Sequence, residues 1–230
     1  MKPYQTIAIR ECGEPLVSIP EEVFSRELPH PYAKLGAPYG DRSPFFVRRG
    51  IGDRLLSAQR TLQQHRPGWR IRIFDAYRPI AVQQFMVDYT FAEVVRSKQL
   101  SPDALTPEQR RDLLEEVYRF WALPSRDRAT PPPHSTGAAI DVTLVDECDR
   151  PLDMGSPIDE LSERSYPNYF IDAKSTAECQ FHANRQLLAD AMTSTGFAQH
   201  PNEWWHFSYG DQLWAWLTQH STAIYGRSDD

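Results

Sequence analysis

The sequence predicts an α+β fold: a small, mainly antiparallel sheet with helices packed against one side and long loops that form a cleft. Alternation of apolar and polar side chains at 70–76 and 138–144 predicts strands. Helical spacing of apolar residues at 51–62 and 178–195 predicts helices between and after these strands. Because the 230 residues contain neither a linker nor an internal repeat, we expect a single domain over 1–230.

The composition is that of an ordinary soluble globular protein, with 40% apolar and 24% charged residues. A formal net charge of −6 disfavours nucleic acid or an anionic membrane surface as a partner. No apolar run reaches membrane-spanning length, and the first residues lack the apolar region of a leader peptide. Cys12, Cys148 and Cys179 are odd in number and far apart, so we expect free thiols in a reducing, cytoplasmic compartment. The composition does not indicate an oligomeric state.

The first fifty residues are rich in proline, glycine and tyrosine and have no sustained periodicity. Ile7 and Ile9, and then Leu16 and Val17, predict short edge strands. The stretch 30–46 is expected to be a structured loop. Packing against the surface of the domain is the favoured role for this loop, ahead of a direct part in catalysis.

Turn and capping residues mark where the helices begin and end. Pro67 and Gly68 stop the first helix before the strand at 70–76, which runs into the sequence DAYRP. Pro79 suits the first turn of a second helix, and Thr106 caps a third. The inward faces are expected to hold Val82, Phe85, Met86 and Tyr89 in the second helix, Leu113, Leu114, Val117 and Phe120 in the third, and Phe181, Leu187, Leu188 and Met192 in the fourth. A short aromatic helix is expected around 213–217, and the chain is expected to fray from Ser221.

The stretch PPPHSTGAAIDV, residues 131–142, carries the first signal of function. His134 ends a proline-rich loop, and Asp141 lies seven residues later on the polar side of a predicted half-buried strand. The turn residues 135–137 can fold His134 back over the side of the strand that carries Asp141. A catalytic zinc needs three protein ligands and an open position for water, and this pair would supply two of the three.

The sequence NEWWHF is the best source of a third ligand. Its aromatic residues favour a strand, so we expect Glu203 on the preceding turn and His206 within the strand. This division suits metal hydrolysis, in which one residue binds the metal and a nearby carboxylate takes a proton from water. By itself, such an aromatic string is more often part of a core or an interface. His200 is the most credible substitute for His206 as a ligand.

Arg78 and the segment 146–175 are further candidates for the site. Pro79 holds Arg78 in an extended conformation at the end of a strand. Its guanidinium could stabilise the oxyanion formed when water adds to a carbonyl. The alternative is an ordinary salt bridge with Asp75. The segment 146–175 is loop-like, and a connection of this length is typical of a lid or a wall of a site.

These motifs together resemble a known family. HSTGAAID fits the pattern HxxGxAxD, and with ExWWH and DAYRP the chain resembles the D-alanyl-D-alanine dipeptidases of the hedgehog/DD-peptidase superfamily, from about Cys12 to Tyr209. The resemblance implies one Zn²⁺ held by His134, Asp141 and His206, with Glu203 as general base and Arg78 stabilising the tetrahedral intermediate. It also implies a short peptide as substrate, most simply D-Ala-D-Ala, whose ammonium group would lie near Asp159 in the sequence MGSPID. For Asp159, a role as a solvated loop residue is nearly as well supported.

One position departs from the family pattern. The family has a serine two residues before the first histidine, where this chain has Pro132, which offers neither a hydroxyl nor an N–H. Metal binding is unaffected, but a polar contact to one end of the substrate is lost. Two alternatives to a dipeptidase stay open: a carboxypeptidase or endopeptidase that acts on longer cell-wall peptides, and a zinc-bearing binding domain without activity. Glu203 and Arg78 argue against the second, because a structural metal site needs neither.

Overall fold

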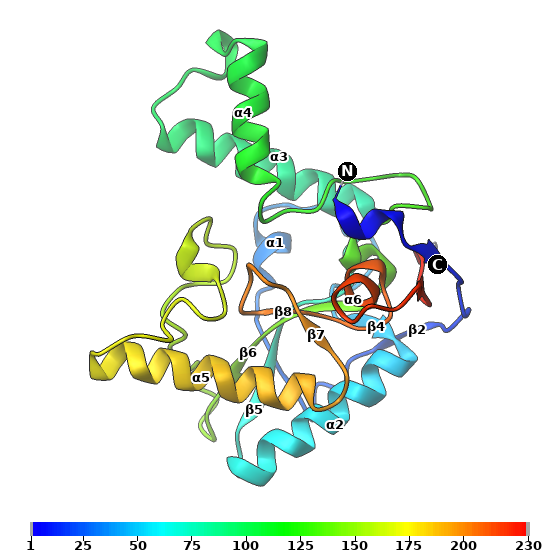
Figure 1. Ribbon diagram of the computed structural model, residues 1–230, viewed down its shortest axis with the longest axis vertical. Helices are drawn as coiled ribbons and strands as arrows, with labels where there is room; N and C mark the ends of the chain where they lie inside the picture. Colours follow the sequence, from blue (N-terminus) through cyan, green and yellow to red (C-terminus); the bar gives the residue numbers. More distant parts are fainter. Residues whose placement is uncertain (1, 229–230) are drawn as a thin grey trace.

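The central sheet is built from the segments whose sequences alternate most clearly. The computed structural model describes residues 2–228, and in it five strands pair in the order β3–β5–β6–β8–β7 (Figure 1). These strands are β3 (Ser25–Arg26), β5 (Arg70–Asp75), β6 (Ala139–Val145), β7 (Ala198–Gln199) and β8 (His206–Ser208). The pair β3–β5 is parallel and the other three pairs are antiparallel, which confirms the predicted α+β class.

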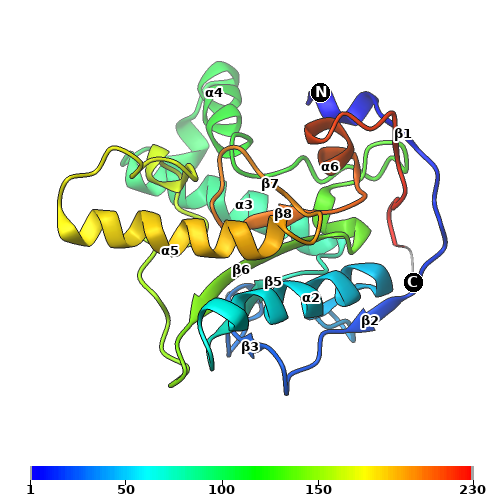
Figure 2. The same ribbon diagram turned by 60° about the horizontal axis from the view of Figure 1, so that its bottom comes forward.

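Two long helices cover one face of this sheet, as expected. Helices α2 (Arg49–His65) and α5 (Thr176–Thr193) lie against β5 and β6 in both views (Figures 1 and 2). Ile140, Val142 and Leu144 of β6 belong to the same buried cluster as apolar residues of both helices. The prediction that β6 is half-buried is wrong, because Ala139 and Asp141 on its other face are buried too. That second face lies beneath the loops that form the site.

A second buried cluster joins α3 (Ile80–Ser97) to α4 (Pro107–Val117), which form a hairpin that extends from the rest of the molecule (Figure 1). Thr106 caps α4 through a reciprocal pair of hydrogen bonds with Gln109, in agreement with the sequence. The predicted inward face of α3 needs one correction. Val82 and Met86 are buried, but Tyr89 is 36% exposed, and the chain buries Phe91 instead.

The remaining elements are short and tie the two ends of the chain to the domain. Strand β2 (Leu16–Ser18) pairs with β4 (Phe46–Arg48), and β1 (Ala8–Ile9) pairs in parallel with β9 (Thr222–Ala223). The helical pieces are α1 (Pro31–Lys34), α6 (Gln212–Leu217) and the 3₁₀ turns η1 (Pro3–Thr6), η2 (Pro102–Ala104), η3 (Pro133–Thr136) and η4 (Glu163–Ser165). The expected fraying from Ser221 is therefore wrong as far as residue 228, because β9 is paired and Tyr225 is buried. None of the helices described has the length and apolar character needed to cross a membrane.

Candidate metal centre

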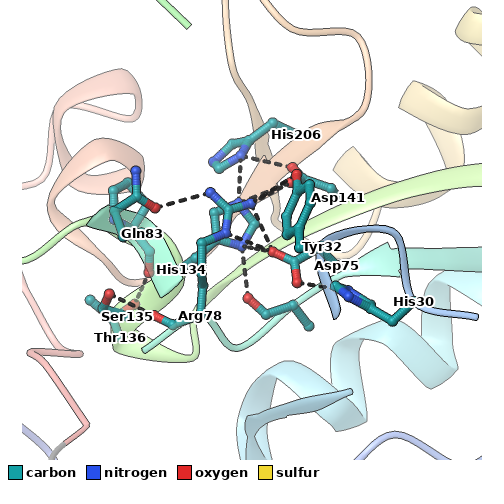
Figure 3. Close-up of polar contacts among 12 residues, drawn as sticks. His30, Tyr32, Asp75, Arg78, Gln83, His134, Ser135, Thr136, Asp141 and His206 are labelled. Atoms are coloured by element: carbon teal, nitrogen blue, oxygen red, sulfur yellow. Dashed lines mark hydrogen bonds and ion pairs between the residues drawn. The ribbon is translucent and has the colours of Figure 1, made fainter. Parts of the chain in front are cut away.

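Three elements of the sheet region bring His134, Asp141 and His206 together (Figure 3). Asp141 of β6 and His206 of β8 are direct partners in the antiparallel ladder, so their positions are set by strand register. The turn η3 ends at Gly137, whose φ of 71° is left-handed and lets the chain turn from His134 into β6. A Cβ at this glycine would lie 2.4 Å from Leu16 Cδ2, so the Leu16 side chain would have to move to admit one.

The atoms of these three residues converge as metal ligands do. His134 Nε2 lies 3.2 Å from His206 Nδ1 and 3.2 Å from Asp141 Oδ2, and His206 Nδ1 lies 3.0 Å from Asp141 Oδ1. Ligands bound to zinc at its usual distances in a tetrahedral arrangement would be about 3.3 Å apart. The donor set of two imidazoles and one carboxylate is that of many catalytic zinc sites. The residues present therefore fit a metal ion of this type.

The outward nitrogen of each histidine is held by a second hydrogen bond. His134 Nδ1 lies 2.7 Å from the carbonyl oxygen of Ala76, which requires that nitrogen to carry the proton and leaves Nε2 free to bind a metal. His206 Nε2 lies 3.2 Å from Ser208 Oγ, and that hydroxyl donates to Asp211 Oδ2 at 2.8 Å. Such outer contacts set the orientation and tautomer of ligating histidines.

Electrostatics keep Asp141 and His206 in the charge states that bind metals. Burial opposes ionisation of Asp141, but His134 and His206 outweigh it and hold the pKa of the carboxyl well below its usual value. Burial lowers the pKa of His206 despite its hydrogen bond to Asp141, so the imidazole is neutral at physiological pH. A deprotonated carboxylate and a neutral imidazole are the forms in which these side chains coordinate a cation.

Glu203 lies beside His206, on the turn before β8, as the sequence predicts. Its Oε2 is 3.7 Å from His206 Nδ1 and its Oε1 is 3.6 Å from His200 Nδ1. Burial, followed by repulsion from Asp141, raises the pKa of this carboxyl well above its usual value. The adjacent Trp204 and Trp205 are fully buried in the main core, so the aromatic string serves both the core and the site.

Arg78 is buried and makes the salt bridge with Asp75 that the sequence offered as one alternative, together with a second ion pair to Asp141. Its Nε donates to Asp75 Oδ2 at 2.9 Å, and its Nη2 lies 3.2 Å from Asp141 Oδ2 (Figure 3). Its Nη1 carries two hydrogens and donates one of them to Gln83 Oε1 at 3.0 Å. Among residues 2–228, Nη1 has no second hydrogen-bond partner. The second Nη1 hydrogen is thus available to a ligand. The backbone of Arg78 is fixed by η3, since Ser135 Oγ donates to its carbonyl at 2.7 Å.

Asp159 reaches the site from the long loop. It accepts a hydrogen bond from Tyr32 at 2.8 Å and sits at a φ of 66°. Burial, followed by repulsion from Asp141, raises the pKa of its carboxyl to about 7. Asp159 forms no ion pair with any residue from 2 to 228, and a half-buried carboxylate of this kind is suited to receive a positively charged group.

The loop 30–46 contributes side chains that the sequence did not identify. Tyr39 and His30 contact Asp75 Oδ1 at 3.0 and 3.1 Å, and Tyr32 stacks on the guanidinium of Arg78 at 5.0 Å. Burial opposes ionisation of Asp75, but Arg78 and then His30 outweigh it and keep the pKa of the carboxyl below its usual value. The sequence carried no signal for this network beyond the abundance of tyrosine in the loop. The expected role of the loop 30–46 was packing, and its side chains in addition hold Asp75 and Arg78 in place.

These residues surround a small cavity of about 40 Å³, which is room for roughly three or four water molecules. It is lined by Lys2, Tyr4, Arg78, Gln83, Phe120, Trp121, Ala122, Pro133, His134, Asp141, Asp159, His200, Glu203, Trp205, His206 and Leu213. All six residues predicted to form the site are in this lining. His200 is there too, but the cluster of convergent ligand atoms in the part of the chain described contains His206 and not His200.

The loop 146–175 is fastened to the turn that carries Glu203. Trp204 Nε1 donates to Ser156 Oγ at 3.0 Å, and the backbone N–H of Trp204 donates to the carbonyl of Ser165 at 2.9 Å. Arg185 of α5 supports the same loop through the carbonyl of Met154 at 2.7 Å. The loop is irregular apart from η4 and a bridge at Pro151, as its composition predicts.

Comparison with known proteins agrees with these motifs. Residues 25–224 match the family described as D-ala-D-ala dipeptidase, Peptidase_M15. The chain is 52% identical to a D-alanyl-D-alanine dipeptidase of Synechocystis over 99% of this chain and 97% of that protein. It is 30% identical to an Enterococcus faecalis protein of the same name, over 72% of this chain and 76% of the relative. A solved LD-carboxypeptidase is similar with a TM-score of 0.45 and 18% identity, over 90% of this chain and 73% of the other. The chain belongs to the D-alanyl-D-alanine dipeptidase family.

Proposed function

We propose that this protein is a zinc-dependent dipeptidase that hydrolyses D-Ala-D-Ala to two molecules of D-alanine. The observation that carries the proposal is the convergence of His134, Asp141 and His206 beside Glu203 in one small cavity. Family membership supports the reaction, since relatives that match most of this chain bear the name of this enzyme. Zinc is the metal proposed, because two imidazoles and one carboxylate leave a fourth position open for water.

The chain's own residues account for the proton transfers and for charge stabilisation. A bound zinc would supply Lewis acidity and bring the pKa of its water close to neutrality. Glu203 accepts the proton of the attacking water and then delivers it to the departing amine. The free Nη1 hydrogen of Arg78 donates to the carbonyl oxygen as it becomes negative. Asp159 binds the ammonium group of the substrate and so orients the peptide bond.

The dimensions of the cavity favour a dipeptide over a longer cell-wall peptide. A carboxypeptidase or endopeptidase needs an open groove for the rest of its substrate, whereas this cavity of about 40 Å³ must widen even to admit a dipeptide. We propose that the loop 146–175 acts as a lid within a single domain of 1–230, and that its hydrogen bonds to Trp204 and Arg185 hold it in the closed position and break when it opens to admit the substrate. A non-catalytic binding domain is less well supported, because Glu203 and Arg78 lie within the site and are not needed for structural metal binding.

We further propose a cytoplasmic role in the turnover of cell-wall peptides. Cys12, Cys148 and Cys179 are free and exposed, which supports a reducing compartment. Titration of the native protein with a thiol reagent, without prior reduction, should detect all three. A smaller number would argue against this location.

The proposal is tested by measuring released amino acid from a panel of D,D-, L,D- and L,L-dipeptides and from a D-Ala-D-Ala-terminated pentapeptide. Hydrolysis of D-Ala-D-Ala that is lost with a chelator and restored by zinc is the expected result. Cleavage of the pentapeptide in preference to the dipeptide would show a carboxypeptidase instead. Absence of hydrolysis from protein that contains zinc would rule out an enzyme of either kind.

A further inference from the structure

The cavity has two ends of different electrostatic character. At one end lies Asp159, which accepts a hydrogen bond from Tyr32. Burial has the largest effect on the pKa of Asp159, and the neighbouring groups that also affect it are Asp141, Arg78, Tyr32 and Asp75. At the other end lies Lys2, whose charge acts on Glu203 and His200. Figures 1 and 2 agree with this division, since the N-terminal segment and the loop 146–175 lie on opposite sides of the β7–β8 turn.

The segment that carries Lys2 is anchored to the domain. Gln212 of α6 donates through Nε2 to the carbonyl of Ile7 at 2.6 Å, just beyond η1. Within η1, the Gln5 side chain accepts from the backbone N–H of Lys2 at 2.8 Å. Tyr4 is buried and lines the same cavity. The turn therefore presents Lys2 to the site as a fixed part of the wall.

Lys2 is also the cation in the cavity wall that no carboxylate neutralises by direct contact. Arg78 is paired with both Asp75 and Asp141. Among residues 2–228, Lys2 forms no ion pair. It does lie close enough to Glu203 to lower the pKa of that carboxyl, in opposition to burial and to Asp141, which raise it. A half-buried ammonium without a paired anion is suited to bind an anionic part of a ligand.

A zwitterionic dipeptide requires two such ends. When its ammonium group lies at Asp159 and its peptide bond lies at the metal centre, its carboxylate must point toward the opposite end of the cavity. The charge of the carboxylate and the position of Lys2 are complementary.

We propose that Lys2 binds the C-terminal carboxylate of the dipeptide and makes the enzyme selective for substrates with a free carboxylate. The inference rests on the proposed dipeptidase activity and adds a specificity residue to it. The ammonium group of Lys2 would contact the substrate carboxylate, which does not change during hydrolysis. The contribution of Lys2 therefore falls on KM more than on kcat.

The experiment compares D-Ala-D-Ala with its neutral amide, D-alanyl-D-alaninamide, as substrates of wild type, Lys2→Gln and Lys2→Arg. Lys2→Gln should raise KM for the dipeptide on the order of 10- to 100-fold, and leave KM for the amide within about twofold, since only the first substrate loses a charged hydrogen bond. Lys2→Arg keeps the charge and should recover most of the affinity for the dipeptide. Lys98→Gln, at the far end of α3, is the matched control and should behave as wild type.

The other outcomes separate this inference from its alternatives. Equal losses on both substrates, expressed in kcat, would mean that Lys2 acts on Glu203 and would overturn carboxylate binding. Unchanged kinetics would overturn it as well. A wild type that cleaves neither compound would instead refute the dipeptidase activity itself. Unfolding temperature and metal content are measured for each variant, so that a loss of folding is not mistaken for a loss of binding.

Discussion

At the scale of single residues, the site shows that one side chain can serve structure and chemistry together. The sequence offered Arg78 either as a salt-bridge partner of Asp75 or as a group that stabilises an oxyanion. The structure makes these roles compatible, because Nε and Nη2 contact carboxylates while Nη1 keeps a hydrogen for a ligand. The planar guanidinium, with five donors in fixed directions, permits this division.

Replacing Arg78 should therefore affect both stability and turnover. Arg78→Ala leaves Asp75 and Asp141 buried without their cation, which should cost about 3–5 kcal/mol of unfolding free energy. Arg78→Lys should recover much of that stability, but its kcat should stay about 100-fold or more below wild type, since the fork is lost. Denaturant unfolding and steady-state kinetics measure the two effects. A wild-type kcat for Arg78→Lys would show that its charge alone is sufficient.

Glu203 allows catalysis to be separated from metal binding. Glu203→Ala retains His134, Asp141 and His206, so zinc content should stay at one per chain. Turnover should fall on the order of 100- to 10,000-fold, as expected for loss of a general base. Metal analysis beside kinetics gives both results. Zinc-replete Glu203→Ala with normal turnover would refute the proposed mechanism, and His134→Ala, which removes a ligand, is the contrasting variant that should lose the metal.

At the scale of elements, the turn η3 and strand β6 form one unit that positions two of the three ligand side chains. The turn places His134 against the end of β5, where its backbone carbonyl accepts from the N–H of Arg78 at 3.2 Å. Gly137 then reverses the chain into β6 at a φ of 71°. The spacing of HxxGxAxD is thus the length of one 3₁₀ turn, one left-handed residue and the first residues of a strand.

Gly137→Ala should damage this unit more than an ordinary left-handed glycine would. The left-handed conformation alone costs an alanine about 1–2 kcal/mol, and the added Cβ also meets Leu16 Cδ2 at 2.4 Å. Gly36→Ala is the matched control, because its φ is 93° but its Cβ would meet nothing within 4 Å. The unfolding free energy is measured for both variants, and their zinc affinity is measured by competition with a chelator. Zinc affinity should be weakened in Gly137→Ala alone. Adding Leu16→Ala should relieve part of the loss, and equal behaviour of the two glycine variants would show that the contact is unimportant.

At the scale of the whole molecule, the metal centre joins parts of the chain that are far apart in sequence. The sheet aligns β5, β6 and β8, Tyr32 of the loop 30–46 contacts Arg78 and Asp159 from outside the cavity lining, and the N-terminal turn η1 lines the cavity through Tyr4. A metal ion bound only by the folded protein stabilises it in proportion to the logarithm of metal concentration over Kd.

Removal of the metal should therefore lower the melting temperature. With zinc at about 1,000 times Kd, the stabilisation is about 4 kcal/mol, or on the order of 10 °C for a chain of this size. Thermal unfolding with zinc and with chelator measures the shift. His134→Ala is the control and should melt at the same temperature in both conditions. An identical melting temperature for the wild type in both would contradict a three-ligand site.

The sequence by itself determined the α+β class, the long helices, the central strands and the group His134, Asp141, Glu203 and His206. These are local signals, because periodicity and capping act over neighbouring residues. The four site residues lie within two short motifs whose spacing follows from a turn and a strand.

Only the tertiary structure decided which distant residues meet at the site. Tyr32 contacts Asp159 across 127 positions, and Lys2 and Tyr4 reach a cavity whose other lining residues come from much later in the chain. The burial of both faces of β6, the exposure of Tyr89 and the pairing of β9 with β1 depended in the same way on what covers each element. Strand pairing, loop packing and burial depend on contacts between segments that no short window of sequence contains. For the same reason, the pKa values of Asp141, Asp159 and Glu203 are properties of the assembled site and not of the residues.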